Sequence, residues 1–147
     1  MRLPIYQVDA FSRRRFAGNP AAVCPLKKWL PDHVLQQIAA ENNLAETAFF
    51  VAEPDGYRLR WFTPEIEIDL CGHATLATAY VLMDCLGFGG DQVTFHTRSG
   101  ALTVSKTGEM FTLDFPARPG ARQPADPALA AALGAEPEAI YAARDTM

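Results

Sequence analysis

The densest group of potentially reactive side chains lies in the segment Asp69-Leu70-Cys71-Gly72-His73-Ala74-Thr75. An almost wholly apolar stretch follows, which predicts that these residues open a buried helix over 72–86. The first turn of a helix leaves backbone N–H groups without partners, and the helix dipole adds partial positive charge there. Gly72 lets a ligand approach the backbone, and Thr75 can add a hydroxyl. The segment therefore predicts a site for a carboxylate or a phosphate.

These residues also have ordinary structural explanations. Gly72 can serve only as a tight turn, and His73 can cap the helix or pack against a neighbour. Cys71 has two readings as well. A thiol near a helix N-terminus has its thiolate favoured and can act as a base or a nucleophile, whereas a small buried apolar side chain suits the same position.

Glu46 is the second candidate for chemistry, within the segment Asn43-Leu44-Ala45-Glu46-Thr47-Ala48-Phe49-Phe50. Apolar neighbours can remove a carboxylate partly from water, which favours its protonated form and suits proton transfer. The alternative is a solvated glutamate at the end of a strand. The residues alone leave both readings open.

The sequence has no pattern typical of a metal or nucleotide site. Cys71 and His73 lack zinc-finger spacing, and Cys85 lies roughly 20 Å from Cys71 along a helix that rises about 1.5 Å per residue. The glycines of Gly87-Phe88-Gly89-Gly90 follow a helix instead of opening one, so they are not a phosphate-binding loop. We therefore predict no metal at the candidate site.

The composition favours a folded domain with a sizeable core, because 49% of the 147 residues are hydrophobic and 20% are charged. A net charge of −4 argues against a nucleic-acid-binding protein. The three cysteines do not form a disulfide framework, the N-terminus lacks the apolar region of a signal peptide, and the longest apolar stretch is too short to span a bilayer. We expect a cytoplasmic protein that binds neither nucleic acid nor membrane.

Hydrophobic periodicity predicts the elements that position these side chains. Strands are expected at 3–11, 21–25, 46–52, 57–63, 92–97, 101–105 and 110–115, helices at 31–42 and 126–133, and a further helical turn at 135–140. Strands on both sides of the enclosed helix at 72–86 indicate an α+β fold, with a curled mixed sheet around that helix. Five proline or glycine residues between 116 and 127 indicate a linker. We expect one domain over 1–117, then a linker and the start of a second, similar domain over 118–147.

The motifs resemble those of the PhzF family of phenazine-biosynthesis-like isomerases and epimerases, which share the diaminopimelate epimerase fold. They are VDAF at 8–11, FAGNPAAV at 16–23, AETAFF at 45–50, RWFTP at 60–64 and DLCGHATLATAYVL at 69–82. The resemblance implies two similar domains, each a curled sheet around a central helix, with the active site in the cleft between them.

The resemblance also implies roles for particular residues. Glu46 is the acid/base that moves a proton on and off carbon. The residues that bind substrate are Gly72, His73, Ala74, Thr75 and, near the same cleft, Asn19. The implied reaction is a proton shift in a small carboxylate-bearing molecule, such as a dihydro-hydroxyanthranilate, with neither an organic cofactor nor a metal. A homodimer is compatible with this reading.

Members of the family carry a second half that supplies a further acidic residue and a second helix start. We therefore expect the 147-residue chain to lack half of its active site and to show no isomerase turnover alone. Cys71 aligns with a catalytic cysteine of related diaminopimelate epimerases and proline racemases, so a cysteine-based racemase or epimerase is the alternative enzyme. A non-catalytic protein that binds small anions is the third hypothesis. The ETAF glutamate marks the PhzF type and favours Glu46 over Cys71 as the base.

Overall fold

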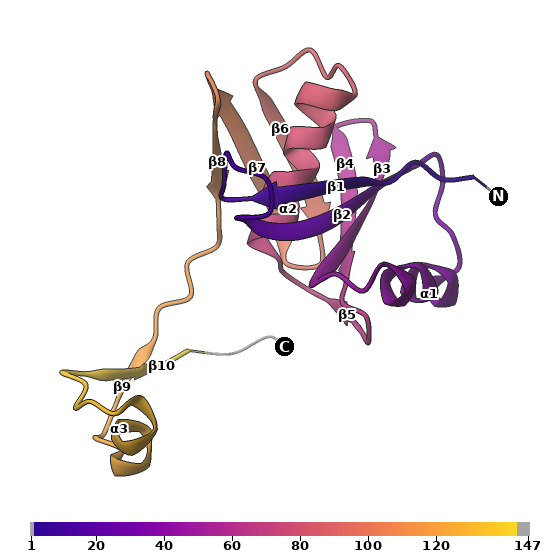
Figure 1. Ribbon diagram of the computed structural model, residues 1–147. Helices are drawn as coiled ribbons and strands as arrows, with labels where there is room; N and C mark the ends of the chain where they lie inside the picture. Colours follow the sequence, from indigo (N-terminus) through magenta and orange to yellow (C-terminus); the bar gives the residue numbers. More distant parts are fainter. Residues whose placement is uncertain (1, 144–147) are drawn as a thin grey trace. The chain divides into compact units, whose positions relative to one another are not determined.

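The computed structural model of the chain describes residues 2–143, which form two compact units that divide between Phe115 and Pro116 (Figure 1). The elements of the first unit are β1 (Tyr6–Ala10), β2 (Asn19–Leu26), α1 (Asp32–Asn42), β3 (Glu46–Glu53), β4 (Gly56–Phe62), β5 (Glu67–Ile68), α2 (Gly72–Tyr80), a π-helical turn (Val81–Cys85), β6 (Gln92–Thr97), β7 (Gly100–Thr107) and β8 (Met110–Asp114). Those of the second unit are β9 (Ala121–Gln123), α3 (Pro127–Leu133) and β10 (Ile140–Ala142).

The first unit is built on one curled, mixed sheet with the strand order β1-β2-β3-β4-β6-β7-β8, and β5 pairs with β4. The pairs β2–β3 and β4–β6 are parallel, and the other neighbours are antiparallel. The strands wrap around α2, which lies inside the curl (Figure 1). The predicted α+β arrangement around an enclosed helix is confirmed.

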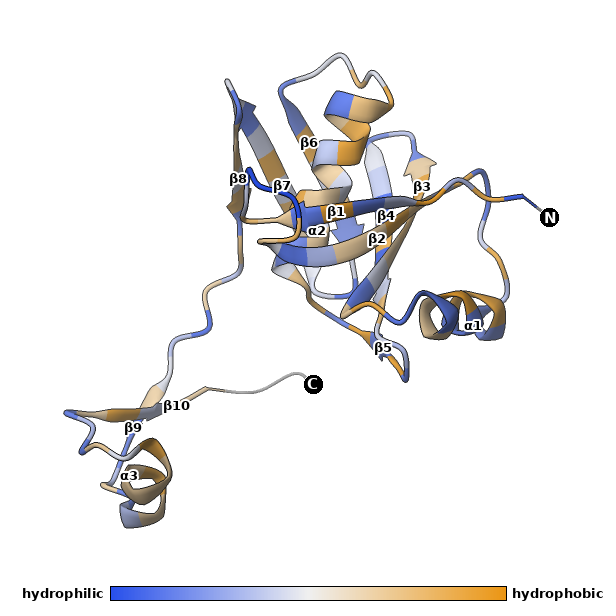
Figure 2. Cartoon of the chain, viewed as in Figure 1, coloured by the Kyte–Doolittle hydropathy of each residue, from blue (hydrophilic) through white to orange (hydrophobic). Residues whose placement is uncertain are grey.

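The central strand β3 is covered on both faces, which explains its continuous apolar sequence. Ala48 and Phe50 belong to the core around α2. Phe49 points to the opposite face and packs in a second core with Leu35 of α1. Figure 2 shows α1 as an amphipathic helix and the middle of the loop between β1 and β2 as strongly hydrophilic. The sheet thus separates two hydrophobic cores, and the larger one encloses α2.

The buried centre of α2 consists of small side chains, which let the strands approach the helix closely. The residues that are at most 1% exposed are Ala74, Thr75, Ala77, Thr78 and Ala79. The hydroxyls of Thr75 and Thr78 donate to the carbonyls of Cys71 and Ala74, one turn earlier. These bonds satisfy both hydroxyls without water.

The helix predicted to run to Leu86 is α-helical only to Tyr80 and continues as a π-helical turn over Val81–Cys85. The Leu86 N–H donates to the Val81 carbonyl over 2.9 Å, the wider spacing of such a turn. The first three residues of this turn are buried, and its last residue, Cys85, is exposed at the surface. Among the described residues, no helix is long and apolar enough to cross a membrane.

The second unit differs from the sequence prediction in two places. β9 lies within the stretch predicted as a linker and pairs with β10 in an antiparallel two-stranded sheet. The helical turn predicted at 135–140 is wrong, because Gly134 ends α3 with a left-handed φ of 67° and Ile140 begins β10. Pro137 also disfavours helical geometry in the residue before it. The predicted helix at 126–133 is confirmed, with Asp126 as its N-cap.

A matched pair of phenylalanine substitutions tests the core. Phe95 is fully buried, whereas Phe16 is 97% exposed. We expect Phe95→Ala to lower the free energy of unfolding by about 3–5 kcal/mol, because it leaves a cavity, and Phe16→Ala to change it by less than about 0.5 kcal/mol. Urea unfolding followed by the fluorescence of buried Trp61 measures both values. Equal losses in the two variants would contradict this assignment of the core.

Candidate active site

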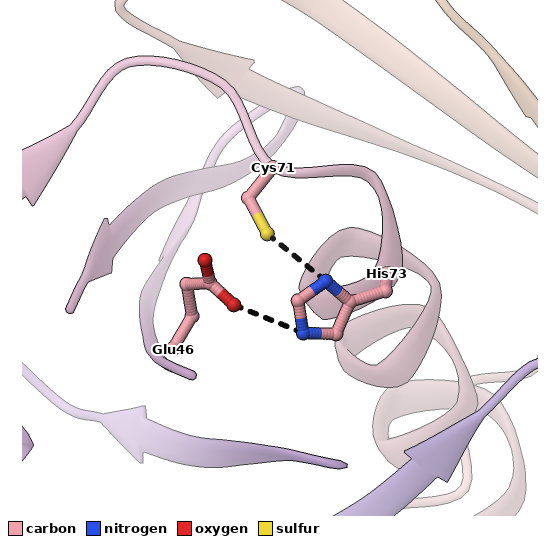
Figure 3. Close-up of side chains that lie close together, drawn as sticks. All are labelled: Glu46, Cys71 and His73. Carbon is pink, nitrogen blue, oxygen red and sulfur yellow. Dashed lines mark hydrogen bonds and ion pairs between the residues drawn. The ribbon is translucent and has the colours of Figure 1, made fainter. Parts of the chain in front are cut away.

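Glu46 and the start of α2 meet on the inner face of the sheet (Figure 3). Asn43 ends α1 in the left-handed conformation, with a φ of 49°, and β3 then begins at Glu46. Alternation along a strand puts Glu46 on the same face as Ala48, which packs in the core around α2. The carboxylate therefore points toward α2, although the two segments are distant in the sequence.

The His73 imidazole lies between Glu46 and Cys71. Its Nε2 is 3.0 Å from Oε2 of Glu46, and its Nδ1 is 3.5 Å from Sγ of Cys71. The side chains of His73 and Glu46 are only 10% and 17% exposed. Oε2 and Nε2 are at ion-pair distance, but neither makes a hydrogen bond with acceptable angles to the described residues. Both atoms therefore retain bonding capacity for a ligand.

Cys71 occupies the N-cap position of α2 with its side chain buried. Burial raises the pKa of its thiol to about 12. The backbone N–H of Ala74 lowers this pKa, and the nearby Glu46 carboxylate raises it. The N–H of His73 also favours the thiolate, but burial outweighs both amides. The thiol is therefore protonated at neutral pH, and the effect of the helix N-terminus expected from the sequence does not prevail here.

The backbone amides at the start of α2 are only partly used within the protein. Within the described part of the chain, no side chain makes a well-formed capping hydrogen bond to them. The Thr75 N–H donates to the Cys71 carbonyl over 3.3 Å, and the buried Thr75 hydroxyl donates to the same oxygen, so Thr75 stabilises the turn itself. The amides of His73 and Ala74 face the Cys71 thiol, a weak acceptor that a ligand carboxylate can replace, and Gly72 adds a third amide beside them.

Gly72 leaves room for the ring of Phe115, the residue that follows β8. A Cβ at Gly72 would lie 3.3 Å from Cε2 of Phe115 and 3.9 Å from Cδ2 of Leu113. The first distance is tighter than ordinary contact, so a larger residue would displace the Phe115 ring. Gly72 thus has a packing role besides the ligand-binding role predicted for it.

Asn19 and Phe11 come from the two ends of the loop that joins β1 to β2. The parallel register sets Ala21 beside Glu46, so Asn19, two residues earlier in β2, shares the inner face with Glu46. Phe11 is 74% exposed, and its ring centroid lies 6.5 Å from that of His73. Its φ of 66° is unusual for an aromatic residue. The place of Phe11 beside His73 was not predicted, because no local sequence pattern signals this backbone conformation.

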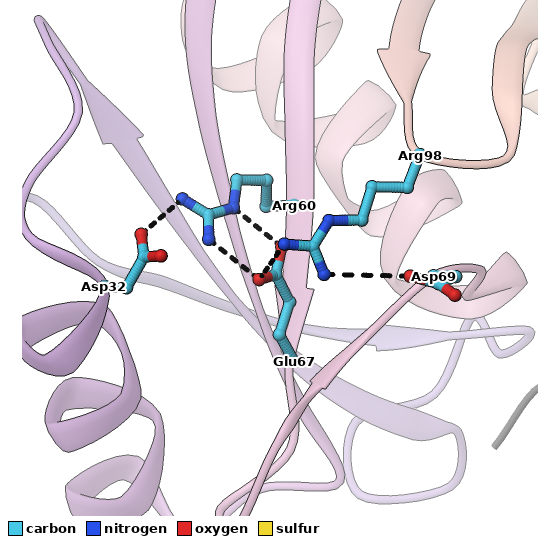
Figure 4. A network of polar contacts seen from close by, with 5 residues as sticks. All are labelled: Asp32, Arg60, Glu67, Asp69 and Arg98. Carbon is cyan, nitrogen blue, oxygen red and sulfur yellow. Dashed lines mark hydrogen bonds and ion pairs between the residues drawn. The ribbon is translucent and has the colours of Figure 1, made fainter.

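A network of ion pairs fastens the segment that leads into α2 (Figure 4). Arg60 of β4 donates to both carboxylate oxygens of Glu67 in β5, over 2.7 and 2.8 Å. Arg60 also donates to Asp32 at the start of α1 over 2.9 Å. Arg98, in the turn between β6 and β7, lies 2.8 Å from Glu67 and 3.8 Å from Asp69. The network therefore joins β4, β5, α1 and the chain just before α2.

The Arg60–Glu67 pair is the best-shielded part of this network, with side chains 16% and 13% exposed. Hydrogen bonds to Glu67 raise the pKa of Arg60 above its ordinary value, and the hydrogen bond from Arg60 lowers the pKa of Asp32. Asp69 is held further by the Ser99 hydroxyl, which donates to its carbonyl over 2.9 Å. These contacts determine where Cys71 and the start of α2 lie. Arg60 is the first residue of the RWFTP motif. A charged residue within an apolar strand was the sequence signal from which its ion pairs could have been predicted.

A groove of about 870 Å³ lies beside the Glu46–Cys71–His73 cluster, not at it. It is bordered by β1, the loop over 11–15, the later part of α2, and the β7–β8 hairpin. Phe11 lines it, whereas Glu46, Cys71 and His73 do not. The candidate site therefore rests on side-chain geometry and burial, and the groove is a separate feature.

Comparison with known proteins supplies the family. The sequence matches the family described as Phenazine biosynthesis-like protein (PhzC-PhzF) over residues 8–135. An uncharacterized isomerase of Pseudomonas aeruginosa is 58% identical over 118 residues, which are 80% of this chain and 46% of that protein. A second uncharacterized isomerase of the same organism is 47% identical over all 147 residues and 56% of its own length. The chain spans about half the length of the curated relatives it matches.

The structural comparison agrees with the sequence comparison. A crystal structure of a PhzF-family phenazine biosynthesis protein from Enterococcus faecalis matches with a TM-score of 0.90 and 53% identity. The match covers 96% of this chain and 54% of that one. The expected diaminopimelate epimerase-like fold is thereby confirmed. Because the match to one family runs without a break from residue 8 to residue 135, the chain belongs to the PhzF family of phenazine biosynthesis-like proteins.

Proposed function

We propose that this domain forms half of the active site of a cofactor-independent isomerase, which moves a proton on a small carboxylate-bearing metabolite by general acid/base catalysis. Glu46 is the acid/base. The observation that carries the proposal is the 3.0 Å approach of Oε2 of Glu46 to Nε2 of His73 at the uncapped start of α2. One place thus combines a proton acceptor with amides suited to an anion.

In the proposed reaction, the substrate carboxylate binds the amides of Gly72, His73 and Ala74. Glu46 takes a proton from a substrate carbon, and the electron pair of that C–H bond stays on the substrate. The partial positive charge at the helix start stabilises the negative charge that develops. The protonated carboxyl then returns the proton to a different carbon, so the step needs no oxidant or reductant.

His73 serves as a positioning residue and a substrate contact in this proposal. Its Nε2 faces Glu46 and its Nδ1 faces Cys71 (Figure 3). The imidazole keeps the Glu46 carboxylate at the helix start, where the substrate is bound. Asn19 and Thr75 complete the proposed site, Asn19 from the neighbouring strand and Thr75 by holding the first helical turn.

Glu46 is a better base than Cys71 in this environment. A pKa of about 12 leaves the Cys71 thiol protonated at neutral pH, and the side chain is buried. Glu46 carries a partly exposed carboxylate in the same place. A cysteine-based racemase would need the thiolate, which burial opposes, so the acid/base isomerase is the function we favour.

The second half of the proposed enzyme faces this site from another domain. The curated relatives extend well beyond the matched part, since the chain covers 46% and 56% of two of them. A substrate held at this helix start needs further groups on its other side to exclude water and supply a second proton donor. We propose that a second, similar domain provides them.

Substitution of Glu46 tests the role of the acid/base. In a full-length protein that carries this domain, Glu46→Gln should slow deuterium uptake from D₂O into a dihydro-hydroxyanthranilate by about 10²–10⁴-fold, because the amide cannot accept the proton. Substrate affinity, measured by calorimetry, should change little. Mass spectrometry of the substrate measures the exchange. Glu41→Gln makes the same chemical change at an exposed position of α1 and should exchange normally.

The same assay separates the alternatives. Undiminished exchange in Glu46→Gln together with its loss in Cys71→Ser would replace the proposal by a cysteine-based racemase, with proline and diaminopimelate as the probes to try next. Binding of the carboxylate without any exchange in the unmodified protein would indicate a non-catalytic anion-binding protein.

Thiol reactivity tests the protonation state of Cys71. At pH 8 a thiol with a pKa of about 12 is thiolate in only about one molecule in 10⁴, so iodoacetamide should modify exposed Cys85 long before Cys71. The Cys71 rate should rise about tenfold per pH unit. Peptide mass spectrometry of the native chain measures both sites, and the urea-unfolded chain is the control. Rapid modification of native Cys71 at pH 8 would argue for a reactive thiolate.

The requirement for a second domain has its own test. We expect the 147-residue chain to show no deuterium exchange under conditions in which the 47%-identical Pseudomonas aeruginosa protein, assayed at full length, exchanges the same substrate. Mass spectrometry of the recovered substrate compares the two. Equal exchange by the short chain would mean that the site is complete within these residues.

A further inference from the structure

The Glu46–Cys71–His73 cluster brings together a thiol, an imidazole and a carboxylate, one donor of each kind that zinc binds in proteins. One candidate ligand atom from each residue lies within 4.8 Å of the other two. A tetrahedral zinc ion with bonds of about 2.0–2.3 Å needs its donors roughly 3.3–3.8 Å apart. Small side-chain rotations therefore suffice to close the cluster around an ion.

The state of the donor atoms points to a ligand. The His73 side chain is nine-tenths buried, and its Nε2 makes no well-aligned hydrogen bond to the described residues. Oε2 of Glu46 is in the same state. Among the described residues, the close polar neighbours of the His73 ring are the two other donors, Cys71 and Glu46. These contacts are long or poorly aligned, so an ion would replace little that stabilises the protein.

We propose that Zn²⁺ binds to Cys71, His73 and Glu46 and blocks the proposed active site. On binding, the S–H proton leaves to solvent, an S–Zn bond forms, and one imidazole nitrogen and one Glu46 oxygen replace water on the ion. The remaining position stays open to water. With its oxygen on zinc, Glu46 can no longer accept a proton from carbon. The metal site stands by itself, whereas the inhibition rests on the proposed function.

The sequence alone indicated no metal site, because Cys71, His73 and Cys85 are wrongly spaced. Cys85 is exposed at the far end of α2 and takes no part. The third donor is Glu46, which the curl of the sheet brings to the helix start.

A second group of donors gives a matched control. Glu53, Asp55 and His96 also lie within 4.8 Å of one another but include no thiol. Glu53 is already paired with Arg58 over 3.2 Å, and Asp55 is 77% exposed. This group is the weaker zinc site, since a soft thiolate donor favours zinc and none is present.

Cobalt(II), a spectroscopic substitute for zinc, tests binding in the reduced 147-residue chain. We expect one equivalent of Co²⁺ to produce a thiolate-to-cobalt charge-transfer band, which Zn²⁺ then removes. Cys71→Ser should abolish the band, and Glu46→Gln and His73→Gln should weaken zinc binding by at least about tenfold. Cys85→Ser and His96→Gln should keep both band and affinity. Circular dichroism establishes that each variant is folded.

The pH dependence gives an independent reading of the same site. Because binding releases the thiol proton, apparent zinc affinity should rise about tenfold per pH unit between pH 7 and 9. Calorimetry in two buffers of different ionisation enthalpy counts the proton released. A band that survives in Cys71→Ser, a band lost in Cys85→Ser, or zinc affinity that does not change with pH would overturn the proposal.

Inhibition is measured separately in the full-length protein by deuterium exchange with and without Zn²⁺, with a chelator to reverse it. Inhibition should already occur at micromolar or lower concentrations of free zinc, and it should disappear when a chelator is added. Exchange that zinc leaves unaffected, in a protein that shows the cobalt band, would overturn the blocking role. A cobalt band in a protein without any exchange would reject the isomerase proposal and leave the metal site standing.

Discussion

Enclosure of α2 by the curled sheet is the constraint on which the rest of the structure depends. A helix enclosed in this way must carry small or apolar side chains, and the most deeply buried residues of α2 are alanines and threonines whose hydroxyls are bonded back to the helix. The polar groups of the buried part of such a helix therefore concentrate at its first turn, where backbone amides meet the edge of the core.

The same enclosure decides the chemistry of the three side chains at that turn. Cys71 is deep enough for burial to raise the pKa of its thiol, while Glu46, at the first position of β3, keeps part of its carboxylate in solvent. Burial therefore keeps the Cys71 thiol protonated within a few ångströms of the Glu46 carboxylate and the His73 ring. In the low dielectric of the core edge, contacts with an incoming anion or cation gain strength.

The polar network outside the sheet supports this arrangement from the other side. Arg60 and Glu67 form a bidentate pair between β4 and β5, and Arg98 extends it to Asp69. Removal of one partner would leave a shielded charge without compensation, which costs more than the pair itself contributes. The network is therefore best understood as a device that sets the position at which the chain enters α2.

Much of the first unit was determined by local sequence. The alternating strands, the amphipathic α1, the apolar α2 and the turn residues led to an α+β sheet around a helix, since hydrophobic periodicity depends on near neighbours alone. The motifs also indicated Glu46 and the segment from Gly72 to Thr75 as the places for chemistry. Local pattern was less informative in the second unit, where β9 and β10 are three residues each and exist only as a pair.

Only the tertiary structure decided how these residues meet. The distance between Glu46 and His73 depends on the curl of a sheet whose strands are far apart in the chain, and no local pattern encodes that curl. The burial of Cys71, which reverses the effect expected from its helix position, also comes from strands packed around it. The same holds for the exposed ring of Phe11 beside His73. The sequence by itself determined which groups are present and on which elements, while their distances and protonation arise from long-range packing.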